Sequence, residues 1–381
     1  MRLLVVGGSD AGIAAALRAR EIDPSVEVTV ALADTYPNYS ICGLPYFLAG
    51  DVPDWLSLAH RSVQELRGAG LELLLEHTAR AIDPAAKRVT LTDGAAHEVA
   101  VAYDRLVVAT GAAPIRPPIE GLDLPGVHVL HTMADSFALN ESIGGRGAGS
   151  ALIVGAGYIG LEMAEALTTR GLEVTVVEQF PEVLPTVDTE LGGTVRTELM
   201  AHGVEVLTGF RVEAVGREDG ALHVKGDSGL ERSVDLVLVV VGVKPDSVLA
   251  GAAGVEIGVK GAIRVNRRME TNLPDVFAAG DCAETYHRIL HAPSYLPLGT
   301  TAHKQGRVAG ENAAGGSRLF EGSLGTQVVK VFELAAARSG LRDDEARAAG
   351  SIRSPSARSH STTRPTTREP RSCTSGSPGT G

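Results

Sequence analysis

The stretch "VGAGYIGLEMAEALTTRGLEVTVVE", residues 154–178, decides the fold class of this chain. Gly155, Gly157 and Gly160 stand at the full G-x-G-x-x-G spacing, between an apolar strand and a run of helical character. A second strand follows and ends at Glu178. A strand, a glycine turn, a helix and a second strand within about 30 residues form one βαβ unit of a doubly wound α/β fold.

Each feature of this unit suits a dinucleotide. The first glycine permits a tight turn, the second lets the backbone approach a pyrophosphate, and the third lets helix and strand pack closely. The helix N-terminus adds free N–H groups and a partial positive charge. Glu178 can accept both ribose hydroxyls of an adenosine, and its charge repels a 2′-phosphate, so NADH is favoured over NADPH.

A second, less regular copy of this plan occupies residues 2–34. Gly7 and Gly12 keep the outer glycine positions, but Ser9 replaces the middle glycine. At the end of the second strand, Leu32 occupies the expected carboxylate position, with Asp34 two residues on. We predict a second dinucleotide here, with Asp34 on the ribose or with other contacts in its place.

Further apolar strands end in small residues at 103–114, 234–245 and 274–282. In "AAGDC" Asp281 follows a strand, where its carboxylate can accept a ribityl hydroxyl while backbone N–H groups face a phosphate. Cys282 is most simply a buried small residue. Strands that alternate with helices predict an α/β architecture, here built twice.

The composition narrows the function classes. With 381 residues, of which 44% are hydrophobic, the chain is long enough for two or three domains. A net charge of −11 argues against nucleic-acid and anionic-membrane partners. Three scattered cysteines are too few for a disulfide framework or a zinc site, so we expect a reducing cytoplasm. The apolar run 236–243 is too short to span a bilayer.

Cys42, in "YPNYSICGLPY", is either a small structural side chain or a redox nucleophile. Composition alone favours the structural interpretation, but the two nucleotide units beside it favour the redox one. A C-x-x-x-x-C pair would mark a dithiol reductase, and here Phe47 stands at the second position. Cys42 would therefore cycle as a mixed disulfide with a small thiol, or as a sulfenic acid.

Together, the paired glycine units, "ATG" at 109–111, "AAGD" at 278–281 and the lone cysteine in "SICGLPY" resemble a known family. This is the two-dinucleotide-fold flavoprotein disulfide reductases, and the pattern is similar to its single-cysteine branch of coenzyme A-disulfide reductases and NADH oxidases or peroxidases. The resemblance extends from residue 1 to about 350. It implies FAD on the first unit beside Cys42, and NAD(P)H on a second unit inserted within the first.

The resemblance also implies roles for individual residues. Leu298 and Thr301 would lie near the flavin ring, Tyr158 would be an aromatic gate over it, and Glu162 would lie near the nicotinamide. The expected FAD contacts are Gly7, Gly8, Ser9, Gly12, Asp34, Thr110, Gly111, Gly280, Asp281, Leu298 and Thr301. The expected NAD(P)H contacts are Gly155, Gly157, Tyr158, Ile159, Gly160, Glu162, Glu178 and Gly242.

The same resemblance predicts a domain order. The expected segments are 1–115 and 245–320 for FAD, 116–244 for NAD(P)H, 321–350 as a remnant of a dimerisation domain, and 351–381 as a disordered tail. The tail holds eight Ser, six Thr, five Arg and four Pro and has too few apolar side chains to fold. If this tail is written in plausible codons and translated in another reading frame, it can give a strand-like segment. We therefore predict that a one-base deletion near codon 350 shifted the reading frame. In that case Cys373 would have no evolved role.

Electrons would pass from NADH through FAD to Cys42 and on to a small disulfide or persulfide, such as coenzyme A disulfide. The alternatives are a peroxide- or oxygen-reducing NADH oxidase with a Cys42 sulfenate, and a flavoprotein reductase of a ferredoxin-like partner. Asp10 stands where the oxygen- and peroxide-reducing relatives usually carry a histidine, and this departure favours thiol or disulfide substrates. Loss of the interface domain would impair the homodimer expected of the family.

Three arginines are candidates for binding the phosphates of coenzyme A, with solvated surface charge as the alternative for each. They are Arg18, Arg20 and Arg61.

Overall fold

The computed structural model describes residues 1–145 and 148–350. The chain divides into two units, Met1–Arg342 and Asp343–Gly381. In the second unit the described element is the helix α9 (Asp343–Ala348). The predicted out-of-frame tail and Cys373 lie outside the described residues.

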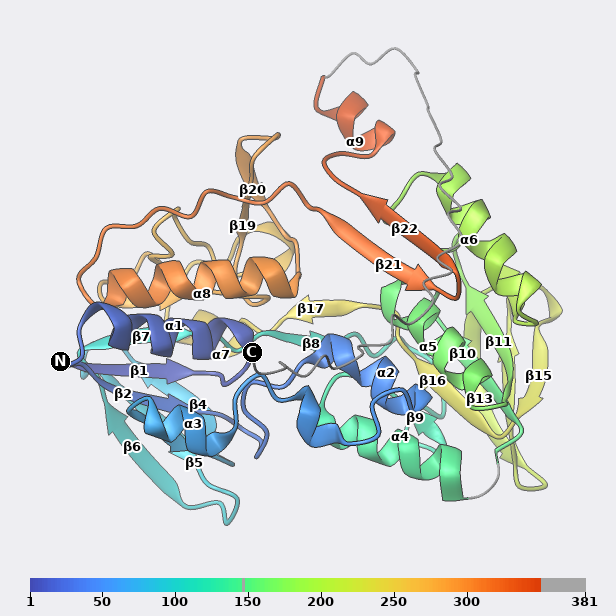
Figure 1. Ribbon diagram of the computed structural model, residues 1–381, viewed down its shortest axis with the longest axis horizontal. Coiled ribbons are helices and arrows are strands. Elements are labelled where there is room, and N and C mark those ends of the chain that lie inside the picture. The colour runs from blue at the N-terminus through green and yellow to red at the C-terminus, as the bar shows by residue number, and fades with distance from the viewer. Residues whose placement is uncertain (146–147, 351–381) are drawn as a thin grey trace, which may run out of the picture. The chain divides into compact units, whose positions relative to one another are not determined.

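The first unit contains two parallel five-stranded sheets (Figure 1). The first sheet has the strand order β18-β7-β1-β2-β3. Its strands are β1 (Arg2–Val6), β2 (Glu27–Ala31), β3 (Leu71–Leu74), β7 (Arg105–Val108) and β18 (Val276–Ala278).

Side chains of β1 alternate between two apolar layers, as a strand buried on both faces requires. Leu3 and Val5 pack under α1 (Asp10–Ile22) and α8 (Gly299–Ala313). Leu4 and Val6 pack under an antiparallel meander. The meander strands are β4 (Thr78–Asp83), β5 (Arg88–Thr92) and β6 (Glu98–Ala102).

The second sheet has the order β12-β11-β10-β16-β9. Its strands are β9 (Val127–His128), β10 (Ser150–Val154), β11 (Glu173–Glu178), β12 (Glu205–Thr208) and β16 (Leu236–Val239). One face packs against α4 (Met133–Gly145), α5 (Tyr158–Thr169) and α6 (Thr189–Ala201). The other packs against β13 (Val212–Glu218), β14 (Ala221–Gly226) and β15 (Glu231–Val234).

All strands of the second sheet fall between β7 and β18 of the first, so the second fold is inserted in the first. The chain passes from the first fold to the second through the short strand β8 (Ala112–Pro114) and returns through β17 (Val243–Pro245). These two strands pair antiparallel with each other. The predicted fold class, with two Rossmann-like folds and one inserted in the other, is confirmed.

Shorter elements connect these layers. Cys42 lies in η1 (Ile41–Gly43), which leads directly into α2 (Leu44–Ala49). The other short helices are η2 (Trp55–Leu58), α3 (Val63–Gly68), η3 (Asp227–Gly229), α7 (Val248–Ala252) and η4 (Val259–Gly261). The other short strands are β19 (Thr285–His287) and β20 (Ala292–Ser294). Within the described ranges no helix has the length and apolar character needed to cross a lipid bilayer.

The segment after residue 325 lies in the range 321–350, which the resemblance assigns to a remnant of a dimerisation domain. It forms a two-stranded hairpin, β21 (Gln327–Val331) and β22 (Leu334–Arg338), before α9. The strand turns at Phe332, which has a φ of 49°. A positive φ at an aromatic residue has no signature in the sequence, so the turn could not be foreseen.

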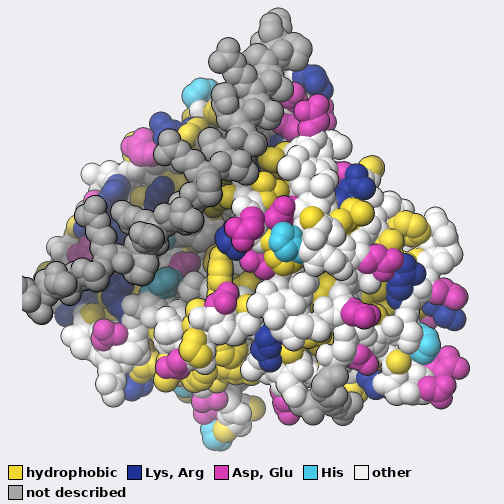
Figure 2. All heavy atoms as spheres, turned by 45° about the vertical axis from the view of Figure 1, so that its right-hand side comes forward, with side chains coloured by type: hydrophobic (Ala, Val, Ile, Leu, Met, Phe, Trp, Pro, Cys, Tyr) yellow, Lys and Arg dark blue, Asp and Glu magenta, His cyan; other side chains and the backbone are white. Residues whose placement is uncertain are grey.

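Charges on the surface are mixed. On the face drawn in Figure 2, Lys and Arg side chains are interspersed with Asp and Glu. Several form exposed ion pairs, such as Arg232 with Glu205 and Lys330 with Glu165.

Candidate functional site

The second glycine loop joins β10 to α5 and leaves room for a ligand. Gly155 has a φ of +105°, and a Cβ built on it would lie 2.7 Å from the Val240 carbonyl oxygen. A Cβ on Gly157 would meet no atom within 4 Å, and no side chain caps the N-terminus of α5. The loop therefore has open space and uncapped N–H groups at the position predicted for a pyrophosphate, and it fits a dinucleotide.

Glu178 ends β11 at the edge of this loop. Its carboxylate is buried and accepts hydrogen bonds from the Ala156 amide at 2.8 Å and the Phe180 amide at 3.0 Å. Each carboxylate oxygen keeps a further lone pair for a ribose hydroxyl. The loop amide thus holds Glu178 in the place that the sequence predicts.

The first glycine loop, between β1 and α1, is more tightly packed. A Cβ on Gly7 would lie 2.0 Å from the Ala109 oxygen, and one on Gly12 would lie 1.9 Å from the Gly7 oxygen. Ser9 is the N-cap of α1, but its side chain makes no capping hydrogen bond. The first-turn N–H groups therefore have no side-chain partner and fit a phosphate.

The acidic partner of the first loop differs from that of the second. Leu32 packs against Gly8, whose added Cβ would lie 2.7 Å from a Leu32 methyl group. Asp34 lies beyond it and accepts a hydrogen bond from the Tyr36 amide at 2.8 Å. Burial raises the pKa of Asp34.

Thr110 and Gly111 follow β7 and anchor the returning chain. The Thr110 hydroxyl donates to the Asp246 carbonyl at 2.5 Å, and the Asp246 amide donates to the Gly111 carbonyl at 3.0 Å. Gly242 stabilises the same crossing, since its carbonyl accepts the Ile115 amide at 2.9 Å. These three predicted contacts therefore lie at the junction of the two folds.

Asp281 follows β18 and the turn at Gly280. Burial, followed by the charge of Asp10, raises its pKa to about 6. Within 1–145 and 148–350 no hydrogen bond or ion pair reaches its carboxylate. A desolvated carboxylate without a donor fits the predicted role of accepting a ligand hydroxyl.

The start of α8 completes this side of the site. Leu298 is the N-cap, and Thr301 is buried with its hydroxyl donating to the Ser323 hydroxyl at 3.4 Å. Sequence reasoning missed Gln305, which is fully buried and accepts the Gly280 amide at 2.9 Å. Gln305 could have been found from the sequence, because it is a polar residue one turn after Thr301 on the apolar face of a helix.

Cys42 is exposed, whereas Cys282 is buried in the core as predicted. Although Cys42 reaches solvent, the surrounding protein removes much of the water from its thiol and so raises its pKa, and the charges of Glu162, Asp10 and Asp281 raise it further. The protein groups therefore favour the protonated thiol at neutral pH. A backbone N–H group at Cys42 lowers the pKa, but its effect is smaller than those of burial and the three carboxylates.

Glu162 and Tyr158 lie one turn apart on α5. Burial, followed by the charge of Glu165, raises the pKa of Glu162 to about 7. The Tyr158 hydroxyl donates to Gln327 Oε1 at 2.6 Å. Ile159, between them in sequence, packs against the apolar core of the second fold.

An aromatic cluster supports the segment that carries Cys42. Tyr36 contacts Trp55 edge-on with ring centroids 5.5 Å apart, and Trp55 contacts Phe137 of α4 at 5.2 Å. Tyr39 stacks on Trp55 at 5.7 Å, and Phe47 of α2 reaches Phe137 at 6.2 Å. The cluster joins the Cys42 segment to the inserted fold.

A hollow of about 170 Å³ opens beside Asp10 and is lined by Asn38, Arg61, His303 and Arg307 among others. The Asn38 side-chain nitrogen is buried without a hydrogen-bond partner. Burial raises the pKa of Asp10, against the opposing charges of His60 and His303. Asn38 was missed by sequence reasoning, since nothing near it in sequence marks it as buried.

The three candidate arginines differ in their surroundings. Arg18 is bound by Glu311 at 2.6 Å and by Glu21 at 2.8 Å. Arg20 donates to the Pro24 and Val26 carbonyls. Arg61 lines the hollow and makes no hydrogen bond in the part of the chain that the structure describes.

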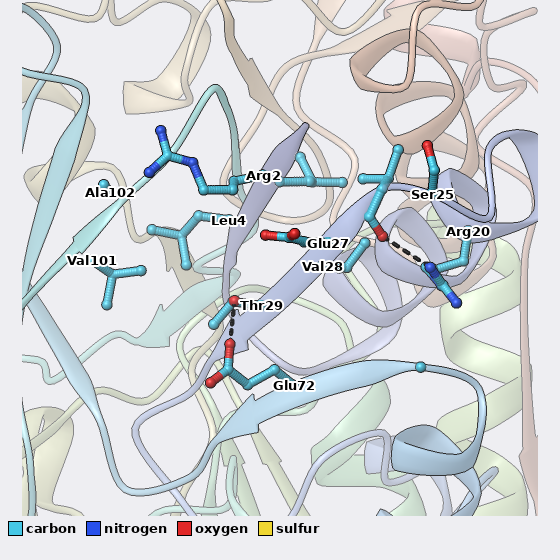
Figure 3. Close-up of a pocket in the computed structure, with 13 residues that line it drawn as sticks. Arg2, Leu4, Arg20, Ser25, Glu27, Val28, Thr29, Glu72, Val101 and Ala102 are labelled. Atoms are coloured by element: carbon cyan, nitrogen blue, oxygen red, sulfur yellow. Dashed lines mark hydrogen bonds between the residues drawn. The ribbon is translucent and has the colours of Figure 1, made fainter.

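A larger cavity, of about 520 Å³, lies elsewhere (Figure 3). It is lined by the amino ends of β1 and β2, and two of its polar side chains pair, since the Thr29 hydroxyl donates to Glu72 at 2.7 Å. Ligands of open α/β sheets bind at the carboxyl ends of the strands. This cavity is therefore separate from the candidate site.

Comparison with known proteins identifies the class. The profile of the pyridine nucleotide-disulphide oxidoreductases matches residues 1–306. The chain is 35% identical to an NADH oxidase of Methanocaldococcus jannaschii, over 90% of this chain and 76% of that protein. It is also 35% identical to a CoA-dependent NAD(P)H sulfur oxidoreductase of Pyrococcus furiosus, over 91% of this chain and 77% of the other.

Among solved structures, an NAD-dependent persulfide reductase from A. fulgidus superposes with a TM-score of 0.88 at 37% identity. The match covers 92% of this chain and 66% of that one, just under two thirds of its length. The chain belongs to the pyridine nucleotide-disulphide oxidoreductase family. The predicted family, its oxidoreductase class and its cofactors, FAD and NADH or NADPH, are confirmed at this level.

Proposed function

We propose that this protein transfers electrons from NADH through FAD to Cys42, and from Cys42 to a small disulfide or persulfide such as coenzyme A disulfide. The observation that carries the proposal is the position of Cys42: an exposed thiol whose pKa responds to Glu162 on one nucleotide fold and to Asp10 and Asp281 on the other. FAD, when bound, supplies the hydride acceptor and the two-electron relay.

The two folds would divide the work as the domain order suggests. Segments 1–115 and 245–320 would bind FAD, segment 116–244 would bind NADH, and segment 321–350 would remain from an interface domain. The residues assigned to FAD are Gly7, Gly8, Ser9, Gly12, Asp34, Thr110, Gly111, Gly280, Asp281, Leu298 and Thr301. The residues assigned to NADH are Gly155, Gly157, Tyr158, Ile159, Gly160, Glu162, Glu178 and Gly242.

The Cys42 sulfur would attack one sulfur of the substrate disulfide. The S–S bond breaks, one half leaves as a thiolate, and Cys42 forms a mixed disulfide with the other half. Two electrons then cleave the mixed disulfide and release the second thiolate, and two protons convert both products to thiols. Glu162, with a pKa of about 7, can hold a proton on this side of Cys42 at neutral pH.

Coenzyme A compounds are favoured as acceptors by the hollow at Asn38. Arg61 would face a phosphate there without breaking a hydrogen bond to the described residues, and the Asn38 amide would gain an acceptor. Arg18 would have to give up Glu311 first, and so contributes less. The P. furiosus relative is itself named CoA-dependent.

An NADH oxidase acting through a Cys42 sulfenate is the second candidate, since the M. jannaschii relative carries that name. Asp10, where peroxide-reducing relatives have a histidine, argues against it. A reductase of a ferredoxin-like protein would not need Cys42 at all.

The test is anaerobic oxidation of NADH by the FAD-loaded protein with coenzyme A disulfide, followed by thiol release. We expect two thiols for each NADH, and loss of this activity in Cys42→Ser while NADH still bleaches the flavin. Cys282→Ala is the matched control and should retain activity. Full activity in Cys42→Ser would overturn the proposal, and NADH consumption that requires oxygen would favour the oxidase.

A cytoplasmic location belongs to this proposal, because three scattered cysteines suit a reducing compartment. The homodimer expected of the family is proposed to be impaired in this protein. Light scattering after size-exclusion chromatography measures the mass: a monomer agrees with this expectation and a stable dimer contradicts it.

A further inference from the structure

The hairpin β21–β22 is attached to the helices of the inserted fold (Figure 1). Glu165 of α5 accepts hydrogen bonds from Lys330 Nζ and from the Phe332 amide, both at 2.8 Å. The Phe332 ring stacks on His202 after α6, with centroids 3.9 Å apart. These contacts fix the turn of the hairpin.

The opposite end of the hairpin reaches the N-terminus of α5. Gln327, the first residue of β21, accepts the Tyr158 hydroxyl at 2.6 Å. The Thr186 hydroxyl donates to the same Tyr158 oxygen at 3.3 Å. Arg338, the partner of Gln327 in the strand register, donates to the Thr186 carbonyl. Tyr158 is thus held between the hairpin and the chain before α6.

Tyr158 links the second glycine loop to the helix that carries Glu162. It is the first residue of α5, and Glu162 follows four residues later on the same helix face. The charge of Glu162 acts on the Cys42 thiol. Tyr158 also packs against the apolar cluster that includes Leu44 of α2, and α2 contacts α5. The Tyr158 ring is therefore packed where α5 begins, directly after the glycines of the second loop.

We propose that Gln327 is a positioning residue that latches Tyr158 in its resting place, and that this bond is released when the nicotinamide enters. The inference rests on the proposed function, in which the second loop binds NADH. The hairpin would then set the affinity for the nicotinamide coenzyme through one side chain, although it lies far from the glycine loop in sequence.

The expected size of the change in coenzyme affinity follows from the strength of one hydrogen bond. Losing it makes the released state easier to populate, so the coenzyme binds more tightly by the same factor. A net contribution of about 0.5–1.5 kcal/mol from this hydrogen bond corresponds to a change of roughly threefold to tenfold in affinity.

The experiment measures the dissociation constant of NAD⁺ for the FAD-loaded full chain by calorimetry. Gln327→Leu removes the acceptor, Tyr158→Phe removes the donor, and Gln327→Glu keeps an acceptor oxygen. Lys330→Met is the matched control, because it breaks a contact of the same hairpin without touching Tyr158. Thermal unfolding of each variant reports that the fold is retained.

We expect Gln327→Leu and Tyr158→Phe each to tighten NAD⁺ binding by roughly threefold to tenfold, and the double variant to match the single ones. Gln327→Glu and Lys330→Met should stay within about twofold of the parent. Unchanged or weaker binding in Gln327→Leu, or an equal shift in Lys330→Met, overturns the latch while the proposed function stands. No NAD⁺ binding by the parent overturns both.

Discussion

At the scale of single residues, Cys42 and Cys282 have opposite surroundings. Cys282 is enclosed by the core, with its sulfur 3.6 Å from the Val108 carbonyl. Cys42 stands exposed at the start of α2, with three carboxylates acting on it. The thiol of Cys282 is therefore closed to reactants and that of Cys42 is open to them, because their tertiary contacts differ.

Glu162 makes stability depend on pH. Its pKa rises from 4.5 to about 7 on folding, so the folded state binds the proton more tightly. The free energy of unfolding therefore falls as pH rises through this range. Glu162→Gln removes the penalty, and we expect it to stabilise the protein by about 1–2 kcal/mol at pH 8 and not at pH 4. Thermal unfolding of both proteins at the two pH values checks this, and an equal difference at both would contradict it.

At the scale of elements, the second glycine loop separates two roles of glycine. Gly155 is needed by the backbone, since its φ is +105° and a side chain would meet Val240. Gly157 has open space around it. We therefore expect the fold to depend on Gly155 and ligand binding to depend on Gly157.

This contrast gives a paired prediction. Gly155→Ala should lower the free energy of unfolding by about 2 kcal/mol or more, because of strain and overlap. Gly157→Ala should leave the unfolding temperature unchanged and weaken NAD⁺ binding at least about tenfold, since its methyl group fills the pyrophosphate space. Calorimetric titration and thermal unfolding measure the two effects. Unchanged NAD⁺ affinity in Gly157→Ala would remove the phosphate role of this loop.

The hairpin gives a second prediction at this scale. Phe332→Ala removes the ring stacked on His202, and we expect a loss of about 1–3 kcal/mol in local stability. Hydrogen exchange of the β21 and β22 amides should accelerate, while the amides of the first sheet keep their rates. Val328→Ala, at a side chain that is 67% exposed, is the control and should leave both regions unchanged.

Sequence reasoning succeeded where spacing itself carries the chemistry. The glycines of 154–178 predicted the βαβ unit, and Glu178 lies where its strand ends. Gln305, Asn38 and Gln327 could not be found in this way. Their importance comes from partners distant in sequence, such as the 169 residues that separate Gln327 from Tyr158.

At the scale of the whole molecule, the aromatic cluster links the Cys42 segment to the inserted fold. Trp55, the single tryptophan of the chain, lies in it beside Phe137. Phe137→Ala should lower the free energy of unfolding by about 2–4 kcal/mol and shift Trp55 emission to longer wavelength. Phe180→Ala, at an exposed ring, should do neither. Fluorescence during urea unfolding measures both, and identical curves for the two variants would contradict the link.

The insertion of one fold into the other begins and ends on a single ribbon. Pro114 pairs with Val243 and Ala112 pairs with Pro245, so the chain leaves and re-enters the first fold at neighbouring points. An inserted fold bounded in this way can be exchanged for another without changing the strand order of the first fold. Under the proposed function, such an exchange would replace the coenzyme-binding fold through two cuts in one ribbon, and it would carry Glu162 and Phe137, which act on the Cys42 segment, along with it.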